Sequence, residues 1–575
     1  MNDHYMEKIC MKTQAIRGLL ISDFNLESFS GYLNNDEESP HLETMATPYS
    51  QVMQVLMSDQ STHWASCPDF ALLWTRPESV IESFNQLLQY EQIPTQRLLD
   101  EVDAYASAVL NLQNKVNHIF LPTWVFPSYH RGFGMLDMKN ERGIANALMR
   151  MNLRLADDLG DASNIYLLNT QKWVENVGKA AYNPKLWYMG KIAFGNGVFK
   201  EVVKDIKAAL RGLQGQAKKL ILVDLDDTLW GGIVGDVGWE HLQLGGHDYM
   251  GEAFVEFQHA LKALMNRGLL LGIVSKNEES VALEAIDTHP EMVLRSEDFV
   301  GWKINWQDKA QNVADLVASL NLGLQSVVFI DDNPVERARV REALPEVLVP
   351  DWPEDKTLYT SALQSLHCFD TPSLTKEDLE RTKMYVSERQ RSQLMQSVGS
   401  LEDWLKSLAI QVDIETLNTG NIKRTTQLLN KTNQLNLTTR RLSEHELELW
   451  VDEDHHHLWT FRVSDKFGDS GLTGIISLEV EGQKGKIVDF ILSCRVMGRN
   501  IEETMLYTVI NHAKSLGLSE VYAQYIQTSK NKPCLDFWKR SSFTDDNADY
   551  CFRWNMDNEY LLPDCISVNM PLHSH

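Results

Sequence analysis

The fold is decided by residues 218–230, which read Lys-Lys-Leu-Ile-Leu-Val-Asp-Leu-Asp-Asp-Thr-Leu-Trp. Leu220 to Val223 form an apolar run that is typical of a short strand buried on both faces. The run ends in carboxylates, and like charges at the end of a buried strand are costly unless a cation lies beside them. Asp224 and Asp226, two residues apart, suit a hard divalent ion such as Mg²⁺. The alternative is a strand followed by an acidic helix cap.

Three further stretches favour the metal site over the helix cap. The apolar run 269–274 ends in Ser275, Lys309 opens a helical pattern over 310–320, and the apolar run 327–330 ends in Asp331 and Asp332. Strands that alternate with helices predict a parallel sheet of βαβ units, and such sheets place their chemistry at the carboxyl ends of the strands. Each motif alone is a weak signal, whereas the ordered set of four is a strong one.

This ordered set resembles the four motifs of the haloacid dehalogenase (HAD) superfamily of aspartyl phosphotransferases, and the chain is identified as an enzyme of that type. The resemblance implies Asp224 as nucleophile, Asp226 as acid/base residue, Thr228, Ser275 and Lys309 as phosphate-binding residues, and Asp224, Asp226 and Asp331 as Mg²⁺ ligands. It leaves Asp332 as either a supporting carboxylate behind these ligands or a helix N-cap. The physics agrees, because a carboxylate attacks a phosphate dianion only where a metal and a cation offset the repulsion.

Within the superfamily the chain is similar to FkbH-like proteins of subfamily IIIC. The similarity covers most of the chain and is carried by residues 226–232, 275–277, 330–337 and 431–438. It implies that a phosphoglyceryl donor loses phosphate and that its glyceryl group passes to an acyl carrier protein. One position departs from the pattern. Relatives that transfer glyceryl have a Cys before the Ser of the second motif, implied to hold the acyl group, and this chain has Val274. Phosphoryl chemistry survives that change, but a Val cannot carry an acyl group.

Composition limits the class of protein and its partners. A chain of 575 residues predicts about three domains, and 43% hydrophobic with 23% charged residues is ordinary for globular proteins. The net charge of −25 argues against nucleic acid and anionic membranes, although an acidic carrier protein could still meet a local basic patch. The seven scattered cysteines without a CxxC pair suit a reducing cytoplasm. We see neither a signal peptide nor an apolar run long enough for a membrane span.

We expect residues 1–215 to form an α/β domain of open-sheet type. Apolar runs at 18–22, 70–74, 118–121 and 164–168 predict strands, and 95–112 has helical spacing. In FkbH-like chains this region resembles the SGNH hydrolase fold. The catalytic order of that fold is missing around Ser22-Asp23, and residues 183–188 offer neither Asp nor His for a dyad. We therefore predict a docking or positioning domain rather than a hydrolase.

We expect residues 216–365 to form the HAD-like phosphotransferase domain, without a large cap. The interval between Asp224 and Ser275 holds a Gly-rich segment at 230–244, which predicts a hairpin flap, and a return helix at 252–267. An uncapped site is open and favours a substrate presented by a larger molecule or a neighbouring domain. The tryptophans near the motifs could line its mouth or pack in the core; they are Trp230, Trp239, Trp302 and Trp306.

We expect residues 366–399 to form a helical connector and 400–575 to form a second flanking α/β domain. Strands are predicted at 458–463, 474–480 and 486–492, followed by a Gly-bearing loop and a helix at 501–516. This order resembles the acetyltransferase (GNAT) fold, whose loop binds pyrophosphate at a helix N-terminus. The resemblance implies contacts to coenzyme A or phosphopantetheine from Arg495, Gly498, Asn500 and Asn531. Asn500 stands where the fold has a small residue, so a purely structural module is the alternative.

One histidine run has a metal-binding and a non-binding interpretation. His455, His456 and His457 could hold a metal, but consecutive strand residues point to opposite faces. A solvated turn among Asp452, Glu453 and Asp454 is the favoured interpretation.

These patterns together predict a cytoplasmic three-domain α/β enzyme with a Mg²⁺-dependent aspartyl phosphotransferase centre. The favoured function is FkbH-like: a small phosphorylated acyl donor is processed and its acyl group goes to an acyl carrier protein in biosynthesis. The enzyme alternative is a plain phosphatase fused to a GNAT-like acyltransferase in surface-polysaccharide or secondary-metabolite synthesis. The non-enzyme alternative is a scaffold that recruits a carrier protein.

Overall fold

The computed structural model describes residues 15–57, 62–246, 248–374, 379–432, 434–442, 444–528, 531–546 and 550–570. The chain divides into two compact units, which we describe separately. The first comprises Met1–Lys219 and Ser361–Leu374, and the second comprises Leu220–Thr360 and Thr375–His575. The division into three domains and a connector remains our interpretation of the sequence.

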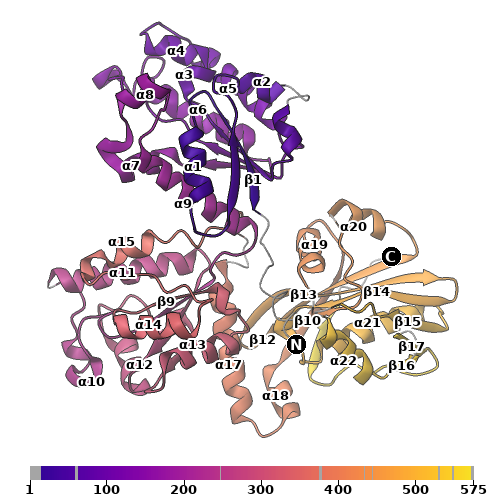
Figure 1. The fold of residues 1–575 in the computed structure, drawn as a ribbon. Helices are drawn as coiled ribbons and strands as arrows, with labels where there is room; N and C mark the ends of the chain where they lie inside the picture. The colour runs from indigo at the N-terminus through magenta and orange to yellow at the C-terminus, as the bar shows by residue number, and fades with distance from the viewer. Residues whose placement is uncertain are drawn as a thin grey trace, which may run out of the picture. The chain divides into compact units, whose positions relative to one another are not determined.

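The first unit is built on a parallel five-stranded sheet in the order β2-β1-β3-β4-β5 (Figure 1). Its strands are β1 (Ile16–Ser22), β2 (Leu42–Ala46), β3 (Phe70–Trp74), β4 (His118–Pro122) and β5 (Ile165–Leu168). Strand β2 escaped the sequence analysis because its pattern is that of an edge strand, with Leu42 its only buried residue.

Helices cover both faces of this sheet because alternate residues of β1 face opposite ways. Leu19 and Ile21 pack with the buried sides of α2 (Val52–Met57), α4 (Glu82–Leu88), α5 (Thr95–Leu110) and α6 (Ile144–Leu159). Leu20 packs instead with α1 (Glu27–Asn35), α7 (Thr170–Val177) and α9 (Asn196–Leu213). The remaining helices of this unit are α3 (Pro77–Val80) and α8 (Pro184–Gly190).

A later segment of the chain belongs to this first unit. The Lys218 backbone N–H donates to the carbonyl of Cys368 at 2.8 Å, and the Arg211 guanidinium donates to the carbonyl of His367 at 3.0 Å. Residues 361–374 therefore group with the first unit although the chain has already passed through the central sheet.

The central sheet is parallel, in the order β8-β7-β6-β9. Its strands are β6 (Leu220–Val223), β7 (Leu270–Ser275), β8 (Phe299–Ile304) and β9 (Val327–Ile330), and its helices are α11 (Tyr249–Asn266), α12 (Glu279–Thr288), α13 (Lys309–Ser319), α14 (Pro334–Ala343) and α15 (Tyr359–Gln364). Leu220 and Leu222 share one core cluster with α13 and Val340 of α14. Strand β8 was not predicted, because Gly301, Trp302 and Lys303 interrupt its apolar pattern at the sheet edge.

The described residues between β6 and β7 contain no second sheet that could form a large cap. The segment predicted as a flap is closed by an antiparallel bridge between Gly231 and Gln243. It carries one short helix, α10 (Val234–Val237), and is followed by α11, which matches the predicted return helix.

The C-terminal part carries a large mixed sheet in the order β16-β17-β15-β14-β13-β12-β10-β18, with the short β11 (Leu435–Asn436) paired to β14. The three predicted strands are present as β12 (His456–Asp465), β13 (Gly468–Glu481) and β14 (Lys484–Leu492). The others are β10 (Ile410–Thr416), β15 (Glu520–Gln524), β16 (Thr544–Asp546), β17 (Cys551–Asn555) and β18 (Ile566–Asn569).

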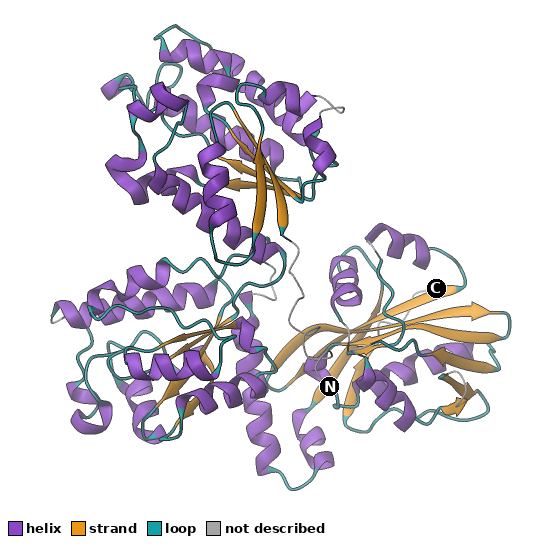
Figure 2. Ribbon diagram, viewed as in Figure 1, coloured by secondary structure: helices purple, strands orange, loops and turns teal. Residues whose placement is uncertain are grey.

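Helices cover this sheet, and Figure 2 shows helices packed around each sheet of the molecule. They are α17 (Arg381–Ser397), α18 (Leu401–Leu408), α19 (Ile422–Lys431), α20 (Glu444–Val451), α21 (Ile501–Ser515) and α22 (Lys532–Arg540). Helix α17 falls within the predicted connector, of which residues 375–378 lie outside the described part. Among the described helices, none combines the length and the apolar character that crossing a membrane requires. The α/β fold class predicted from the sequence is confirmed.

Candidate active site

The sheet register gathers the motif residues at one edge. Val223 of β6 pairs with Ile273 of β7 and with Ile330 of β9, all in parallel. Asp224, Ser275 and Asp331 therefore stand at or just past the carboxyl ends of three neighbouring strands, as the sequence predicted.

Lys309 lies between two of these carboxylates. It is the first residue of α13, and its Nζ is 2.9 Å from Asp224 Oδ2 and 2.7 Å from Asp331 Oδ2. Burial alone would lower the pKa of Lys309, but the two carboxylates more than offset this and the pKa is raised. Burial, with Asp224 nearby, raises the pKa of Asp331 to about 6. The lysine is thus held charged and in place between the carboxylates of Asp224 and Asp331.

The other oxygen of Asp224 has no hydrogen-bond partner among the residues that the structure describes. Asp224 Oδ1 is fully buried, and a buried anionic oxygen without a partner is expensive. Carboxylate oxygens of Asp224, Asp331 and Asp332 lie within 4.8 Å of one another. Among the described residues, two lysines pair with these three carboxylates, Lys309 and Lys356, the latter 3.4 Å from Asp332. The donor set and its excess negative charge fit a hard divalent cation such as Mg²⁺.

The Asp226 carboxylate has different neighbours from those of Asp224, Asp331 and Asp332. Its Oδ1 accepts the indole N–H of Trp230 at 2.9 Å and the backbone N–H of Val234 at 3.0 Å, and its Oδ2 accepts the amide of Asn277 at 3.0 Å. Burial nevertheless raises the pKa of Asp226, which suits a carboxyl that exchanges a proton. Its side chain was also predicted as a metal ligand, but it is not among the three carboxylates that converge.

The residues predicted to bind phosphate are buried and hydrogen-bonded. The Thr228 hydroxyl accepts the backbone N–H of Asp332 at 3.2 Å and lies 3.4 Å from that residue's carboxylate. The Ser275 hydroxyl accepts the Asn277 amide at 3.2 Å. Asp332 itself is half-buried, and burial raises its pKa.

Two polar residues of this site were missed by the sequence analysis. Asn277 is 3% exposed and bridges Asp226 and Ser275 through one amide nitrogen. Lys356 donates to the backbone carbonyl of Asp227 at 2.8 Å and pairs with Asp332. Asn277 follows Ser275 closely and could have been suspected on that ground. Lys356 lies 24 residues beyond Asp332, where no pattern marks it.

Val274 and two of the tryptophans near the motifs differ in how far they are buried. The Val274 side chain is fully buried in the core cluster that includes Val313 of α13. Trp230 is also fully buried and positions Asp226, whereas Trp306 is 72% exposed. Residue 274 thus packs in the core, and Trp230 is a core residue with a hydrogen-bonding task.

The four residues predicted to contact coenzyme A have different surroundings. The Gly498 N–H donates to the carboxylate of Glu502 at 2.8 Å, and Arg495 donates to the sulfur of Met384 at 3.2 Å. Asn500, in the left-handed region at φ 61°, is the N-cap of α21. Asn531 is completely buried, and its amide bonds the Tyr525 hydroxyl and the carbonyls of Asn436 and Ile526. Asn531 therefore has a structural role here.

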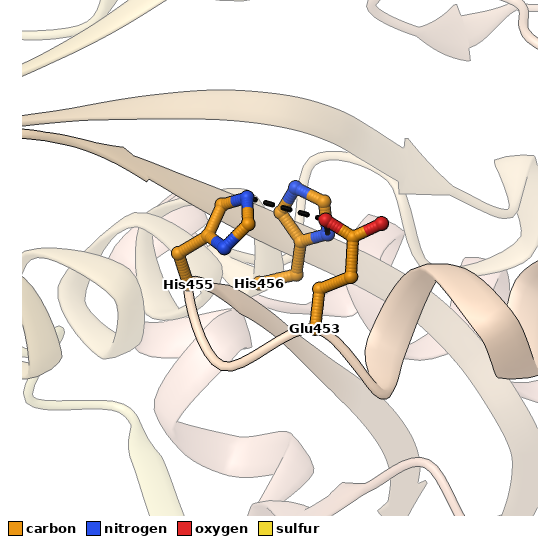
Figure 3. A group of neighbouring side chains, drawn as sticks. All are labelled: Glu453, His455 and His456. Carbon is orange, nitrogen blue, oxygen red and sulfur yellow. Dashed lines mark ion pairs between the residues drawn. The ribbon is translucent and has the colours of Figure 1, made fainter.

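The histidine run differs from the expectation. Figure 3 shows His455 and His456 converging on Glu453, with His455 Nε2 3.3 Å and His456 Nδ1 3.7 Å from the Glu453 carboxylate. The alternation rule fails because β12 begins at His456, so His455 still belongs to the preceding turn. The three side chains are close enough to hold a metal. However, His456 Nδ1 already bonds the carbonyl of Trp450 at 2.7 Å, and both other residues are half-exposed.

Comparison with solved structures finds a phosphatase among the similar proteins. The N-terminal part of protein BF1531 from Bacteroides fragilis, containing a phosphatase domain complexed with Mg, shares 27% sequence identity with this chain. The match covers 63% of this chain and 95% of that one, with a TM-score of 0.56. This similarity and the gathered motif residues show an enzyme with a HAD-type phosphatase domain.

Weaker matches cover about a quarter of the chain. The ribosomal-protein-S18-alanine N-acetyltransferase from Escherichia coli is 8% identical over 25% of this chain and 94% of its own, with a TM-score of 0.20. Spermidine N-acetyltransferase from Vibrio cholerae, in complex with CoA and spermine, is 15% identical over 26% and 96%, also at 0.20. No protein-family model and no curated protein matches the chain.

Proposed function

We propose that the central domain is a Mg²⁺-dependent aspartyl phosphatase or phosphotransferase that acts on a small phosphorylated compound. The observation that carries this proposal is the buried Asp224 oxygen without a partner, beside a carboxylate oxygen held by Lys309. A carboxylate with one oxygen fixed and the other unengaged is arranged for attack or for metal binding rather than for structure.

Each step of the reaction has a residue in place. Asp224 attacks phosphorus, the bond from phosphorus to the leaving oxygen breaks, and Asp226 donates a proton to that oxygen. Water then attacks the phosphorus of the aspartyl phosphate, Asp226 takes up the proton of that water, and phosphate leaves as Asp224 is restored. Lys309 and Lys356 offset negative charge at the two sides of the carboxylate trio.

Asp224, Asp331 and Asp332 would hold the Mg²⁺ ion. When bound, it would supply positive charge that offsets repulsion between the phosphate and the carboxylates. The relative from Bacteroides fragilis, which contains a phosphatase domain complexed with Mg, supports the same choice of metal.

The finer proposal is that the substrate is a phosphorylated acyl donor of the glyceryl type and that its acyl group passes to an acyl carrier protein in the cytoplasm. The FkbH-like motifs support it. Because Val274 is buried in the core, an acyl group carried at residue 274 is excluded. The acyl group would then go directly to the phosphopantetheine thiol of the carrier.

A plain phosphatase joined to an acyltransferase-like domain is the second candidate. It is favoured by Val274. This valine replaces the cysteine that is implied to hold the acyl group in relatives, but it leaves all phosphoryl-transfer residues intact. A carrier-recruiting scaffold with a vestigial site is disfavoured, because a vestigial site would have no reason to keep Lys309 buried between two carboxylates.

One experiment separates these functions. The full chain is incubated with Mg²⁺ and a panel of phosphorylated small acids, with and without holo carrier protein, while released phosphate and carrier mass are followed together. Phosphate release with a carrier mass increase supports acyl transfer, and release alone supports the plain phosphatase. No release from any substrate, or release that EDTA does not reduce, would contradict both.

A further inference from the structure

The first unit contains a cavity of about 300 Å³ that the proposed phosphatase centre does not use. It lies at the carboxyl ends of three neighbouring strands, because its lining includes Thr75 after β3, Thr123 after β4 and Thr170 after β5. This is the side of a parallel sheet where ligands bind in open α/β folds. Its volume falls in the range of pockets for small molecules.

Aromatic side chains form a large part of the wall. They come from the strand ends and from the segment around α8, and they are Trp74, Phe126, Tyr129, Tyr182, Trp187 and Phe194. Flat, rigid walls of this kind favour a planar apolar body, which can stack on them or meet their edges.

Two buried polar atoms of the lining have no hydrogen-bond partner within the described part of the chain. The Thr170 side chain is completely buried, and its hydroxyl has no partner among the described residues. The Glu78 side chain is 10% exposed; its Oε1 faces Arg76, while its Oε2 is buried without a partner. Leaving such groups unpaired is costly, so both indicate hydrogen bonds that a ligand would complete.

Arg76 is the one positively charged residue of the described lining, and two carboxylates flank it. Arg76 lies 2.8 Å from the Asp23 carboxylate and 3.3 Å from Glu78, and its guanidinium stacks on the Trp187 ring at 4.1 Å. Burial raises the pKa of Glu78, which makes the neutral carboxyl more accessible. An anion would have to displace a carboxylate from Arg76, and with Glu78 protonated the Arg76–Asp23 pair leaves no net charge to attract a cation, so a neutral ligand fits best.

The pocket lacks the groups of a hydrolase. Its described lining contains neither His nor Cys. Ser22, at the end of β1, is buried, and its hydroxyl accepts the backbone N–H of Phe24 at 3.1 Å. The site is therefore built for binding rather than for nucleophilic catalysis.

We propose that this pocket binds a neutral aromatic compound of one or two rings that carries an amide or hydroxyl group. The ring lies among the aromatic walls, and the polar group meets Glu78 Oε2 and Thr170 Oγ1. This assignment is independent of the phosphatase centre.

The test uses the full chain and ligand-observed saturation-transfer NMR with cinnamamide, benzamide and 2-naphthylmethanol, together with calorimetric titration of the best of the three. For ligands of this size we expect a Kd of about 1 mM or below. Cinnamate, the charged analogue of cinnamamide, is expected to bind about tenfold more weakly or not at all, because Arg76 is already paired. Absence of signal from all three neutral probes, or tighter binding of cinnamate, would overturn the proposal.

Variants locate the binding. Ala193→Trp fills the cavity from a partly exposed position and is expected to abolish the signal, and Thr170→Val is expected to weaken binding about threefold to tenfold. Glu82→Gln, an exposed change on α4 outside the pocket, is the control variant and should leave Kd unchanged. Thermal melts confirm folding of each variant. Unaltered binding in both Ala193→Trp and Thr170→Val would place the probes elsewhere and refute this assignment.

Discussion

Burial raises the pKa of the Asp226 carboxyl group. Replacing Asn277 tests whether the hydrogen bond from its side-chain amide holds that carboxyl group in position. One amide nitrogen of Asn277 donates to Asp226 Oδ2 at 3.0 Å and to Ser275 Oγ at 3.2 Å. A hydrogen bond to a charged group contributes about 1.5–3 kcal/mol. If Asn277→Ala loses that amount in the transition state, kcat falls about 10–150-fold, since each 1.36 kcal/mol is a factor of ten.

A second substitution at the same residue separates lost positioning from simple loss of packing. Asn277→Asp nearly keeps the volume but places a carboxylate against Asp226 at about 3 Å, where like charges repel by about 5 kcal/mol at an effective dielectric of 20. We therefore expect Asn277→Asp to be less active than Asn277→Ala. A cavity effect alone would give the opposite order, because the alanine leaves the larger void.

The assay is steady-state phosphate release at saturating Mg²⁺ on the best substrate of the panel, with KM and kcat measured separately. We expect kcat to fall while KM changes little, and Asp226→Asn to lose about 10²–10⁴-fold. Asn277→Ala combined with Asp226→Asn should be no worse than Asp226→Asn alone, because both act through one group. Additive losses, or greater activity in Asn277→Asp than in Asn277→Ala, would refute this role.

Three further predictions concern the nucleophile, the metal and the acyl group. Asp224→Asn should reduce phosphate release by more than about 10³-fold with an unchanged thermal melt, and retention of several per cent of the activity would exclude an aspartyl phosphate. Asp331→Ala should raise the Mg²⁺ concentration for half-maximal activity about tenfold or more, and an unchanged metal titration would remove Asp331 from the ligands. No hydroxylamine-sensitive acyl group should form on the protein after incubation with donor. Burial raises the pKa of the Cys368 thiol to about 12, which makes it a poor nucleophile, so a thioester found there by peptide mapping would contradict direct transfer.

Hydrophobic periodicity and the ends of the strands predicted most of the site residues, but only some of the residues that hold them in position. Asp224, Ser275 and Asp331 end apolar runs, and the parallel register brings them to one edge, so their placement could be predicted from the sequence. Lys356 could not, because it comes from a short helical turn whose position depends on tertiary packing rather than on local pattern. Edge strands such as β2 were missed for a related reason, since half-exposed strands lack the continuous apolar run.

Rules applied beyond their range account for the remaining differences. Alternation of side chains holds inside a strand, but His455 precedes β12, and its ring therefore meets that of His456 at a centroid distance of 4.3 Å. Asn531 was grouped with coenzyme A contacts by resemblance, whereas every polar atom of its side chain bonds the protein itself. A polar residue at the expected place in the sequence can stabilise the fold as readily as it can bind a ligand.

The loop before α21 bears on which function the C-terminal part can have. A pyrophosphate held at a helix N-terminus needs unengaged backbone N–H groups. Here the Gly498 N–H bonds Glu502, a residue of the first turn of α21, and burial raises the pKa of Glu502. The adjacent Arg499 is also committed, since its guanidinium pairs with Glu388 at 2.5 Å and Asp465 at 3.5 Å. Coenzyme A binding in this loop would have to displace Glu502, so the geometry favours a structural or carrier-presenting role. Under the proposed function, any acyl transfer would then take place at the site around Asp224.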